Sequence, residues 1–218
     1  MQNRELQEYY RARAPEYEQI YYRDNPQRRA EIDEQAGLLR DLVKGKDVLE
    51  LACGTGYWTK IMSETASSIM AVDSAPEMLV EARKKTYRVP VEFAEADMFT
   101  ESFGSDKYDI VALGFWFSHQ PKQEYDRLFE VLAAPLKKTG QIWMIDNNPP
   151  AEGPEMRPVG IDHFGNKYKK RFLDNGEEYV ILKNYFSRDD LVGYFEETFE
   201  IVSLVHKTCY WSAILKPL

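Results

Sequence analysis

The sequence predicts an α/β fold in which a doubly wound, mostly parallel sheet carries helices on both faces. Two observations support this prediction. Residues 47–58, DVLELACGTGYW, combine a short apolar run, a turn of small residues and a segment that can form a helix. Two further apolar strands end in acids, at Asp73 and Asp97. Because the carboxyl ends of parallel strands meet at one edge of a sheet, these acids should face a common crevice.

The composition bounds the class of protein. A chain of 218 residues with 44% hydrophobic residues is long enough for one globular domain with a large core. Its 28 basic and 36 acidic residues give a net charge of −8, which argues against a nucleic-acid partner. Cys53 and Cys209 form no disulfide framework, and no apolar run approaches the length of a membrane span. We therefore expect a cytoplasmic protein without a membrane partner, and the polar N-terminal residues predict no signal peptide.

The N-terminal segment predicts two helices rich in tyrosine. Residues 4–13 have helical character, and Pro15 favours the first turn of a second helix. Tyrosine combines an apolar ring with a hydrogen-bonding tip, so these residues suit either half-buried packing or a lid over the crevice. The tyrosines are Tyr9, Tyr10, Tyr17, Tyr21 and Tyr22.

The first strand follows a predicted helix over residues 27–43, which ends at Gly45. The turn after this strand has the spacing acidic-x-small-x-Gly-x-Gly, which differs from the pyrophosphate-binding G-x-G-x-x-G. A carboxylate at the strand end would repel a pyrophosphate and would suit a ligand with cationic or donor groups. The alternative is an ordinary tight turn. The residues of the pattern are Glu50, Ala52, Gly54 and Gly56.

The second, third and fourth strands are predicted over residues 68–73, 90–97 and 108–114. Asp73 lies about 20 residues after the glycine turn, where this architecture places an acid on a ribose. Its alternative role is the N-cap of the helix that starts after Ser74. The crevice should lie above the first and fourth strands.

The second half predicts a helix over residues 122–136, a stop at Gly140 and a fifth strand over residues 141–146. Asp174-Asn175-Gly176 separates two strand-like segments and predicts a hairpin. This inserted hairpin is a candidate for substrate selection, and the alternatives are a structural flap or a dimer contact.

A final helix over residues 187–195 and an antiparallel pair of strands, residues 199–206 and 210–215, complete a predicted seven-stranded sheet. We expect one domain, 1–218, with four parts. These parts are an N-terminal helical lid (1–26), a ligand-binding core (27–146), a loop with the inserted β-hairpin (147–186), and the closing helix and strands (187–218).

Four motifs resemble, in this order, those of class I S-adenosylmethionine-dependent methyltransferases of the small-molecule type. They are ELACGTG, with Ala52 where many members have glycine, VDSAPEML around Asp73, EADMF around Asp97, and YDIVALGF. They cover residues 47–115, and the resemblance extends more loosely to about residue 146. It implies a Rossmann-like fold, S-adenosylmethionine as the cofactor and S-adenosylhomocysteine as its product.

The resemblance also implies roles for individual residues. Glu50 and the glycine-turn backbone would hold the methionine moiety, and Tyr17 would contact the same end. Asp73 would accept hydrogen bonds from both ribose hydroxyls, and Asp97 from the adenine amino group. The remaining expected cofactor residues are Ala52, Gly54, Gly56, Ser74, Met78 packing on adenine, Met98 with its backbone N–H, and Gly114 and Phe115 at the sulfonium side. Trp58, Phe115 and Trp116 suit the cationic cofactor as aromatic faces, or else belong to the core.

His119 is the candidate catalytic residue, because it follows the fourth strand, where the resemblance directs the transferred methyl group. A histidine can remove a proton from the acceptor near neutral pH. The alternative is a hydrogen-bonding residue, because in-line placement of nucleophile and methyl group can suffice. His206 is expected to be structural, and the sequence shows no metal cluster.

The predicted function is methyl transfer from S-adenosylmethionine to an O or N atom of a small soluble metabolite by in-line displacement. The alternatives are a protein or tRNA methyltransferase and a catalytically silent, cofactor-binding scaffold. The expected partner is a small-molecule methyl acceptor, with the protein a monomer or homodimer. The sequence does not identify the acceptor.

Overall fold

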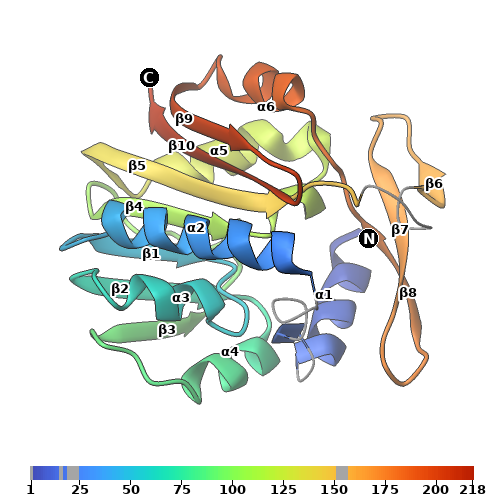
Figure 1. The fold of residues 1–218 in the computed structure, drawn as a ribbon, viewed down its shortest axis with the longest axis horizontal. Coiled ribbons are helices and arrows are strands. Elements are labelled where there is room, and N and C mark those ends of the chain that lie inside the picture. Colours follow the sequence, from blue (N-terminus) through green and yellow to red (C-terminus); the bar gives the residue numbers. More distant parts are fainter. Residues whose placement is uncertain (1, 15–16, 19–24, 151–156) are drawn as a thin grey trace.

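The computed structural model describes residues 2–14, 17–18, 25–150 and 157–218, and the statements below concern these residues. A seven-stranded sheet forms the centre, with the strand order β3-β2-β1-β4-β5-β10-β9 (Figure 1). Strands β1 to β5 pair in parallel, whereas β10 is antiparallel to both β5 and β9, so the predicted sheet is confirmed. The strands are β1 Asp47–Leu51, β2 Ser68–Asp73, β3 Val91–Glu95, β4 Tyr108–Gly114, β5 Leu136–Asn147, β9 Phe199–His206 and β10 Tyr210–Pro217.

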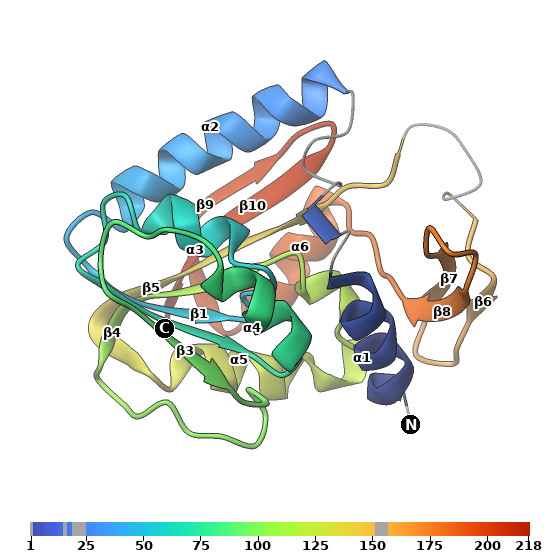
Figure 2. The same ribbon diagram turned by 90° about the horizontal axis from the view of Figure 1, so that it is seen from below.

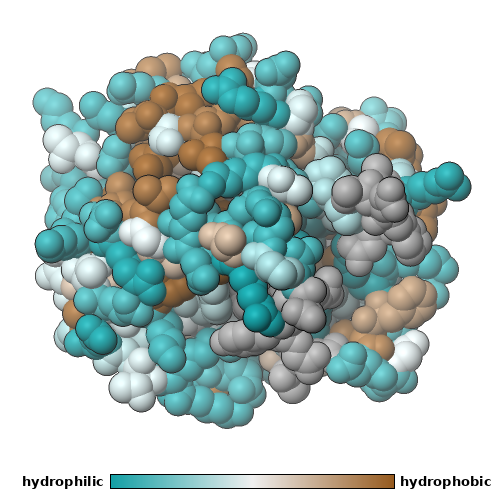
Figure 3. Space-filling model, viewed as in Figure 1, coloured by the Kyte–Doolittle hydropathy of each residue, from teal (hydrophilic) through white to brown (hydrophobic). Residues whose placement is uncertain are grey.

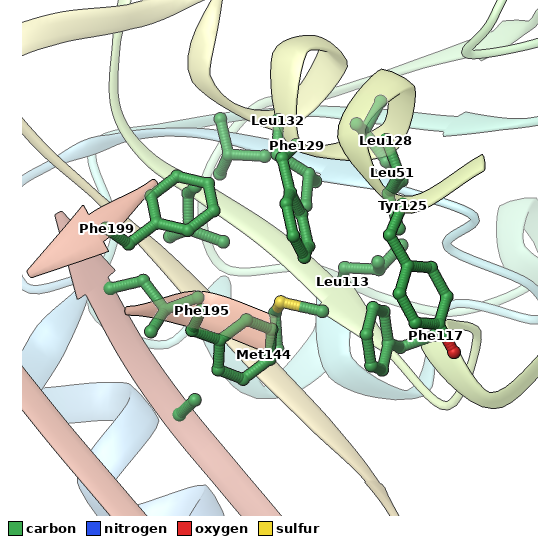
Figure 4. Packing of buried hydrophobic residues seen from close by; sticks show 14 of the residues in the cluster. Leu51, Leu113, Phe117, Tyr125, Leu128, Phe129, Leu132, Met144, Phe195 and Phe199 are labelled. Atoms are coloured by element: carbon green, nitrogen blue, oxygen red, sulfur yellow. The ribbon is translucent and has the colours of Figure 1, made fainter. Parts of the chain in front are cut away.

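Helices cover both faces of this sheet (Figures 1 and 2). On one face, α2 Pro26–Leu42 and α3 Tyr57–Met62 bury apolar residues such as Leu39 and Met62 against Val48 of β1. On the other face, α5 Tyr125–Ala133 and α6 Arg188–Phe195 supply the cluster shown in Figure 4. There Leu128, Phe129, Leu132 and Phe195 pack over Leu51, Leu113 and Met144 of the central strands.

The segment between α5 and β5 differs from the prediction. Helix α5 ends at Ala133, and β5 already begins at Leu136, so Gly140 lies inside the strand and does not precede it. Between the pairs Tyr108–Leu136 and Ile110–Gln141, β5 carries extra residues that bulge out of the ladder. A Cβ at position 140 would lie 2.9 Å from the Lys137 carbonyl oxygen, so the glycine is required by close packing in this bulge. Helix α5 also begins later than predicted, at Tyr125, because residues Lys122–Glu124 form a 3-10 turn.

A second, three-stranded sheet contains the predicted hairpin. Its strands are β6 Gly160–Ile161, β7 Lys167–Phe172 and β8 Glu178–Leu182, and the Gly176 φ of +87° fits the predicted turn. Helix α1 Gln2–Arg13 lies between this sheet and the main body (Figure 1). It packs Leu6 and Tyr9 against Ile181 of β8, so two segments far apart in sequence lie side by side.

The predicted second N-terminal helix falls mostly outside the described residues, as do Pro15, Tyr21 and Tyr22. The remaining helix, α4 Pro76–Arg83, follows β2 as predicted. On the face shown in Figure 3, hydrophilic side chains dominate, and hydrophobic surface gathers over the end of the sheet that contains β9 and β10. None of the described helices is long and apolar enough to cross a membrane.

Candidate active site

A pocket of about 780 Å³, its open mouth included, lies beyond the carboxyl ends of β1 to β4. Most of the expected cofactor residues line it, namely Tyr17, Ala52, Gly54, Asp73, Ser74, Met78, Asp97, Met98, Gly114 and Phe115. Its other lining residues are Leu6, Tyr10, Val72, Ala75, Ala96, Phe99 and Trp116.

The glycine turn owes its shape to left-handed backbone angles and to Asp73. Ala52 has a φ of +52° and Gly54 a φ of +56°, so this turn requires the conformation that glycine adopts most readily. The Gly54 N–H donates to Asp73 Oδ2 at 2.8 Å, and the Ala75 N–H donates to Oδ1 at 2.9 Å. Asp73 therefore fixes the glycine turn on β1 relative to the start of α4, and burial raises the pKa of its carboxyl.

Glu50 lies beneath the pocket and not in its wall. Its side chain is 2% exposed, and the Thr59 hydroxyl donates to its Oε2 at 2.5 Å. Burial raises the pKa of Glu50 to about 8, because the desolvated carboxylate has no cationic side chain in contact among the described residues. A cationic ligand group above Glu50 would therefore be strongly favoured.

Gly56 and Trp58 also lie outside the pocket lining. Gly56, with a φ of +79°, is the N-cap of α3, and a Cβ there would lie 2.6 Å from the Tyr87 hydroxyl. Trp58 is a core residue, 3% exposed, with its ring 5.0 Å from that of Trp143. It supports the pocket from behind, since a Cβ at Gly114 would lie 2.5 Å from the Trp58 ring.

Asp97 follows β3 at the opposite end of the pocket from the glycine turn. Its Oδ1 accepts from the Phe99 N–H at 2.9 Å, which folds the chain into a turn around the carboxylate. Met98 and Phe99 join it in the pocket wall. The pocket thus has acids along the ends of β2 and β3, at the spacing expected from the sequence.

Helix α1 closes one side of the pocket through Leu6 and Tyr10. The hydroxyl of Tyr10 lies 2.7 Å from Nε2 of His119. The resemblance singled out Tyr17, which also lines the pocket, and it did not indicate Tyr10. Burial raises the pKa of Tyr10 well above its usual value, so its hydroxyl stays protonated.

His119 is 5% exposed and uses both ring nitrogens. Its Nδ1 lies 2.7 Å from the Leu182 carbonyl oxygen, which can only accept, so Nδ1 carries the proton. Nε2 then accepts from the Tyr10 hydroxyl. Burial and the nearby Lys183 ammonium lower the pKa of His119 to about 3, and the imidazole is neutral. The pocket wall contains Tyr10 and not His119 itself.

A buried ion pair lies next to His119, and the sequence did not predict it. Lys183 Nζ lies 3.1 Å from Asp146 Oδ1 and donates to the Ser118 hydroxyl at 2.5 Å. Asp146 also accepts from the Ser118 N–H at 2.8 Å. Asp146 is the acid near the carboxyl end of β5, so the rule that identified Asp73 and Asp97 would have found it. Lys183 follows the inserted hairpin, and no sequence pattern indicates its partner.

Within the described ranges, no three His, Cys, Asp or Glu side chains gather as a metal site would require. His206 lies in β9, where its Nε2 is 3.0 Å from the Phe186 carbonyl oxygen.

Comparison with known proteins relates this fold and pocket to one class of enzyme. Residues 48–140 match the methyltransferase domain family. A demethylmenaquinone methyltransferase of Staphylococcus aureus is 25% identical over 169 residues, which span 71% of this chain and 67% of that protein. The corresponding protein of Bacillus licheniformis is 27% identical over 116 residues. That match spans 51% of this chain and about half, 49%, of the relative.

Solved structures give a similar result over nearly the whole chain. The DhpI–SAH complex superposes with a TM-score of 0.79 at 26% identity, covering 98% of this chain and 95% of that chain. The DhpI–SAM–HEP complex superposes with a TM-score of 0.78 at 25% identity, covering 99% and 98%.

The fold and the acid-lined pocket are consistent with a methyltransferase. With these matches, the chain is a class I S-adenosylmethionine-dependent methyltransferase.

Proposed function

We propose that the enzyme transfers a methyl group from S-adenosylmethionine to an O or N atom of a small soluble metabolite. The observation that carries the proposal is the pocket itself, which offers acids for a cationic nucleoside cofactor and is covered by α1. In this proposal residues 1–26 act as the lid and residues 147–186 select the acceptor. The described parts of both segments lie against each other, through Leu6, Tyr9 and Ile181.

The residues present fit the cofactor. Asp73 has two backbone donors on its carboxylate, and each oxygen retains a lone pair for a ribose hydroxyl. Asp97 and the Met98 backbone would hold the adenine amino group and ring, with Met78 packed against the base. Glu50, buried without a cationic partner among the described side chains, would pair with the methionine ammonium. The cofactor supplies an electrophilic methyl group at its sulfonium.

The protein's own part in the reaction is to orient the acceptor and to exclude water. The Tyr10 hydroxyl donates its hydrogen bond to His119 Nε2, so its oxygen can still accept a hydrogen bond on the side that faces the pocket. An acceptor O–H or N–H that donates to this oxygen would have its lone pair held toward the sulfonium. His119 then acts as a positioning residue through Tyr10, which is the second of the two roles left open by the sequence.

A demethylmenaquinone-type acceptor is a second candidate, favoured by the names of the curated relatives. Protein, tRNA and scaffold functions have no comparable support in the described residues. One assay separates these possibilities. The purified enzyme is incubated with methyl-labelled S-adenosylmethionine in four separate reactions. Each reaction contains one candidate acceptor, which is a soluble metabolite extract, demethylmenaquinone, tRNA or protein.

We expect label in the metabolite extract and its loss in Gly54→Val, whose side chain would enter the pocket facing Tyr17 at a position with a φ of +56°. Label only in demethylmenaquinone would establish the second candidate. Label in no fraction, together with normal cofactor binding, would identify a silent binder and contradict the proposal.

A further inference from the structure

Cationic side chains gather beyond the sulfonium side of the pocket, at the carboxyl end of β5. Gly114, which lines the pocket, pairs with Ile145 of β5. The next two residues of β5 are Asp146 and Asn147, and each contacts a cation. Lys183 Nζ reaches Asp146 at 3.1 Å, and Arg28 Nη2 reaches Asn147 Oδ1 at 3.0 Å.

Arg28 has donor capacity that the described residues do not use. Its guanidinium stacks 4.7 Å from the centre of the Tyr210 ring, and its Nε is buried without a hydrogen-bond partner among the described residues. An unpaired buried donor costs free energy, so such a group is usually satisfied by a ligand or by water. The nearby carboxylate of Glu31 is already engaged by the backbone N–H groups of Cys209 at 2.9 Å and Tyr210 at 3.2 Å.

Lys183 contributes a second buried cation. Its ammonium has three donors, and the described acceptors are Asp146 and Ser118. Lys169, 2% exposed, lies on the other strand of the hairpin, and both lysines approach the Tyr185 ring, at 5.5 Å for Lys169 and 5.8 Å for Lys183. Arg28 and Arg171 are close enough to lower the pKa of Lys183, together with its burial.

The hairpin directs these charges inward. Residues 167, 169 and 171 share one face of β7, because side chains alternate along a strand. Lys169 pairs with Ile181 of β8, and Ile181 packs against Leu6 and Tyr9 of α1. This basic face is therefore the one turned toward the main body, where α1 also lies (Figure 1).

Aromatic contacts connect this basic region to the pocket on two sides. The Tyr210 ring lies 5.7 Å from the pocket residue Phe115, and Arg28 stacks on Tyr210. On the other side, the pocket residue Tyr10 is hydrogen-bonded to His119, and the charge of Lys183 is close enough to lower the pKa of His119. Arg28 therefore reaches the pocket residue Phe115 through Tyr210, and Lys183 reaches the pocket residue Tyr10 through His119.

We infer that the methyl acceptor carries an oxyanion, a carboxylate or a phosphate, which binds between Arg28 and Lys183. The inference rests on the proposed function, since it names the chemical class of the acceptor for that site. An oxyanion supplies the acceptor atoms that the described residues do not offer to Arg28 Nε and the third Lys183 N–H. Charge-assisted hydrogen bonds of this kind are strong. An apolar quinone offers no group of this kind to the two cations.

The test is a calorimetric titration of the full chain in two stages. S-adenosylhomocysteine is titrated first, and the loaded protein is then titrated with inorganic phosphate or with sodium acetate at constant ionic strength set by chloride. We expect millimolar or tighter binding of at least one anion. Phosphate alone indicates a phosphorylated acceptor, and acetate alone indicates a carboxylic acid. Binding of neither anion overturns the inference.

Arg28→Gln is the diagnostic variant and Lys170→Gln its control. Lys170 is a neighbouring lysine on the exposed face of β7, paired with Glu178 at 2.5 Å. We expect anion affinity to fall at least tenfold in Arg28→Gln and to stay within twofold in Lys170→Gln. Equal loss in both, or in neither, overturns the inference. If Arg28→Gln does not fold, Lys183→Gln takes its place with the same criteria.

The titration with S-adenosylhomocysteine tests the proposed function separately from the anionic acceptor. Failure of wild-type protein to bind S-adenosylhomocysteine contradicts the proposed function. Normal S-adenosylhomocysteine binding without anion binding overturns only the anionic acceptor.

Discussion

Tyr10 and His119 lie 109 positions apart in the chain, and the Tyr10 hydroxyl is 2.7 Å from His119 Nε2. The contact joins the N-terminal helix to the turn that follows β4. Because the Leu182 carbonyl fixes the proton on Nδ1, the direction of the bond is determined, and Tyr10 presents an acceptor oxygen to the pocket. The acceptor oxygen at this side of the pocket is therefore supplied by helix α1, which lies N-terminal to the strands that carry the rest of the site.

Tyr10→Phe removes this oxygen and leaves the ring. We expect kcat to fall about 10-fold or more while the affinity for S-adenosylhomocysteine stays within threefold, because only the orientation of the acceptor is lost. The control is Tyr179→Phe, a hairpin tyrosine whose hydroxyl contacts Glu177 at the surface. An unchanged kcat in Tyr10→Phe would remove Tyr10 from the reaction.

The pH profile distinguishes a positioning histidine from a base. With a pKa lowered to about 3, His119 is neutral throughout pH 6–8 in the free enzyme. We therefore expect kcat/KM to depend on pH between pH 6 and pH 8 in the same way in the wild type and in His119→Gln. A fall of this kind, with an apparent pKa of about 6–7 and present only in the wild type, would make His119 the general base.

Glu50→Gln should raise stability and lower cofactor affinity. The unfolded chain releases the Glu50 proton near pH 4.5, whereas the folded protein without ligand holds it up to about pH 8. Unfolded protein thus binds fewer protons in this window, and the contribution of Glu50 to the free energy of unfolding falls as the pH rises. Glutamine removes that loss, so the variant should melt higher than wild type at pH 8.5 and about equally at pH 5.

The same substitution should abolish a pH dependence of binding. If the ligand ammonium pairs with ionised Glu50, wild-type affinity for S-adenosylhomocysteine rises from pH 6 to pH 8, and Glu50→Gln binds at least 10-fold more weakly without that rise. Glu64→Gln, at a surface ion pair with Arg40, serves as the control. Equal affinities for wild type and Glu50→Gln at pH 8 would separate Glu50 from the cofactor.

Asp73→Ala should affect both binding and local structure. We expect cofactor affinity to fall by about 1.5–3 kcal/mol, from the loss of a charged hydrogen-bond acceptor. Because the carboxylate also holds the N–H groups of Gly54 and Ala75, the melting temperature should fall as well. Calorimetric titration and thermal unfolding measure the two effects, and unchanged affinity in the folded variant would exclude Asp73 from the site.

Removal of residues 1–23 tests the proposed lid. The cut leaves Asn25, whose side chain caps α2 by accepting from the Arg28 N–H. We expect a folded protein that binds the cofactor more weakly and has no turnover, since Leu6 and Tyr10 leave the pocket wall. Full activity in the truncated protein, measured by formation of S-adenosylhomocysteine, would end the lid proposal.

The sequence predicted the fold best at strands that end in a functional acid or in a turn of small residues. The strands that carry Glu50 and Asp73 were predicted to the residue or nearly so, because apolar runs end at small turns or acids whose placement follows from a parallel sheet. Gly140 was misread because a glycine inside a bulge has the same local signature as a glycine that ends a helix.

Contacts between distant segments could not be predicted from the sequence. Arg28, Asp146 and Lys183 come from three separate elements, and only the assembled sheet brings them together. Trp58 was expected either as an aromatic face for the cationic cofactor or in the core, and the structure places it in the core. Periodicity says which face of an element is apolar, and does not say which neighbour that face will meet.

The central claim is that the pocket above the glycine turn binds the methyl donor. Calorimetric titration of S-adenosylhomocysteine into Gly54→Val and Gly176→Val tests it most directly, since both glycines have a positive φ, +56° and +87°. A side chain at Gly54 would face Tyr17 in the pocket, whereas one at Gly176 would meet open space at the hairpin turn. We predict wild-type affinity in Gly176→Val and no measurable binding in Gly54→Val. Equal affinity in the two folded variants would contradict the account.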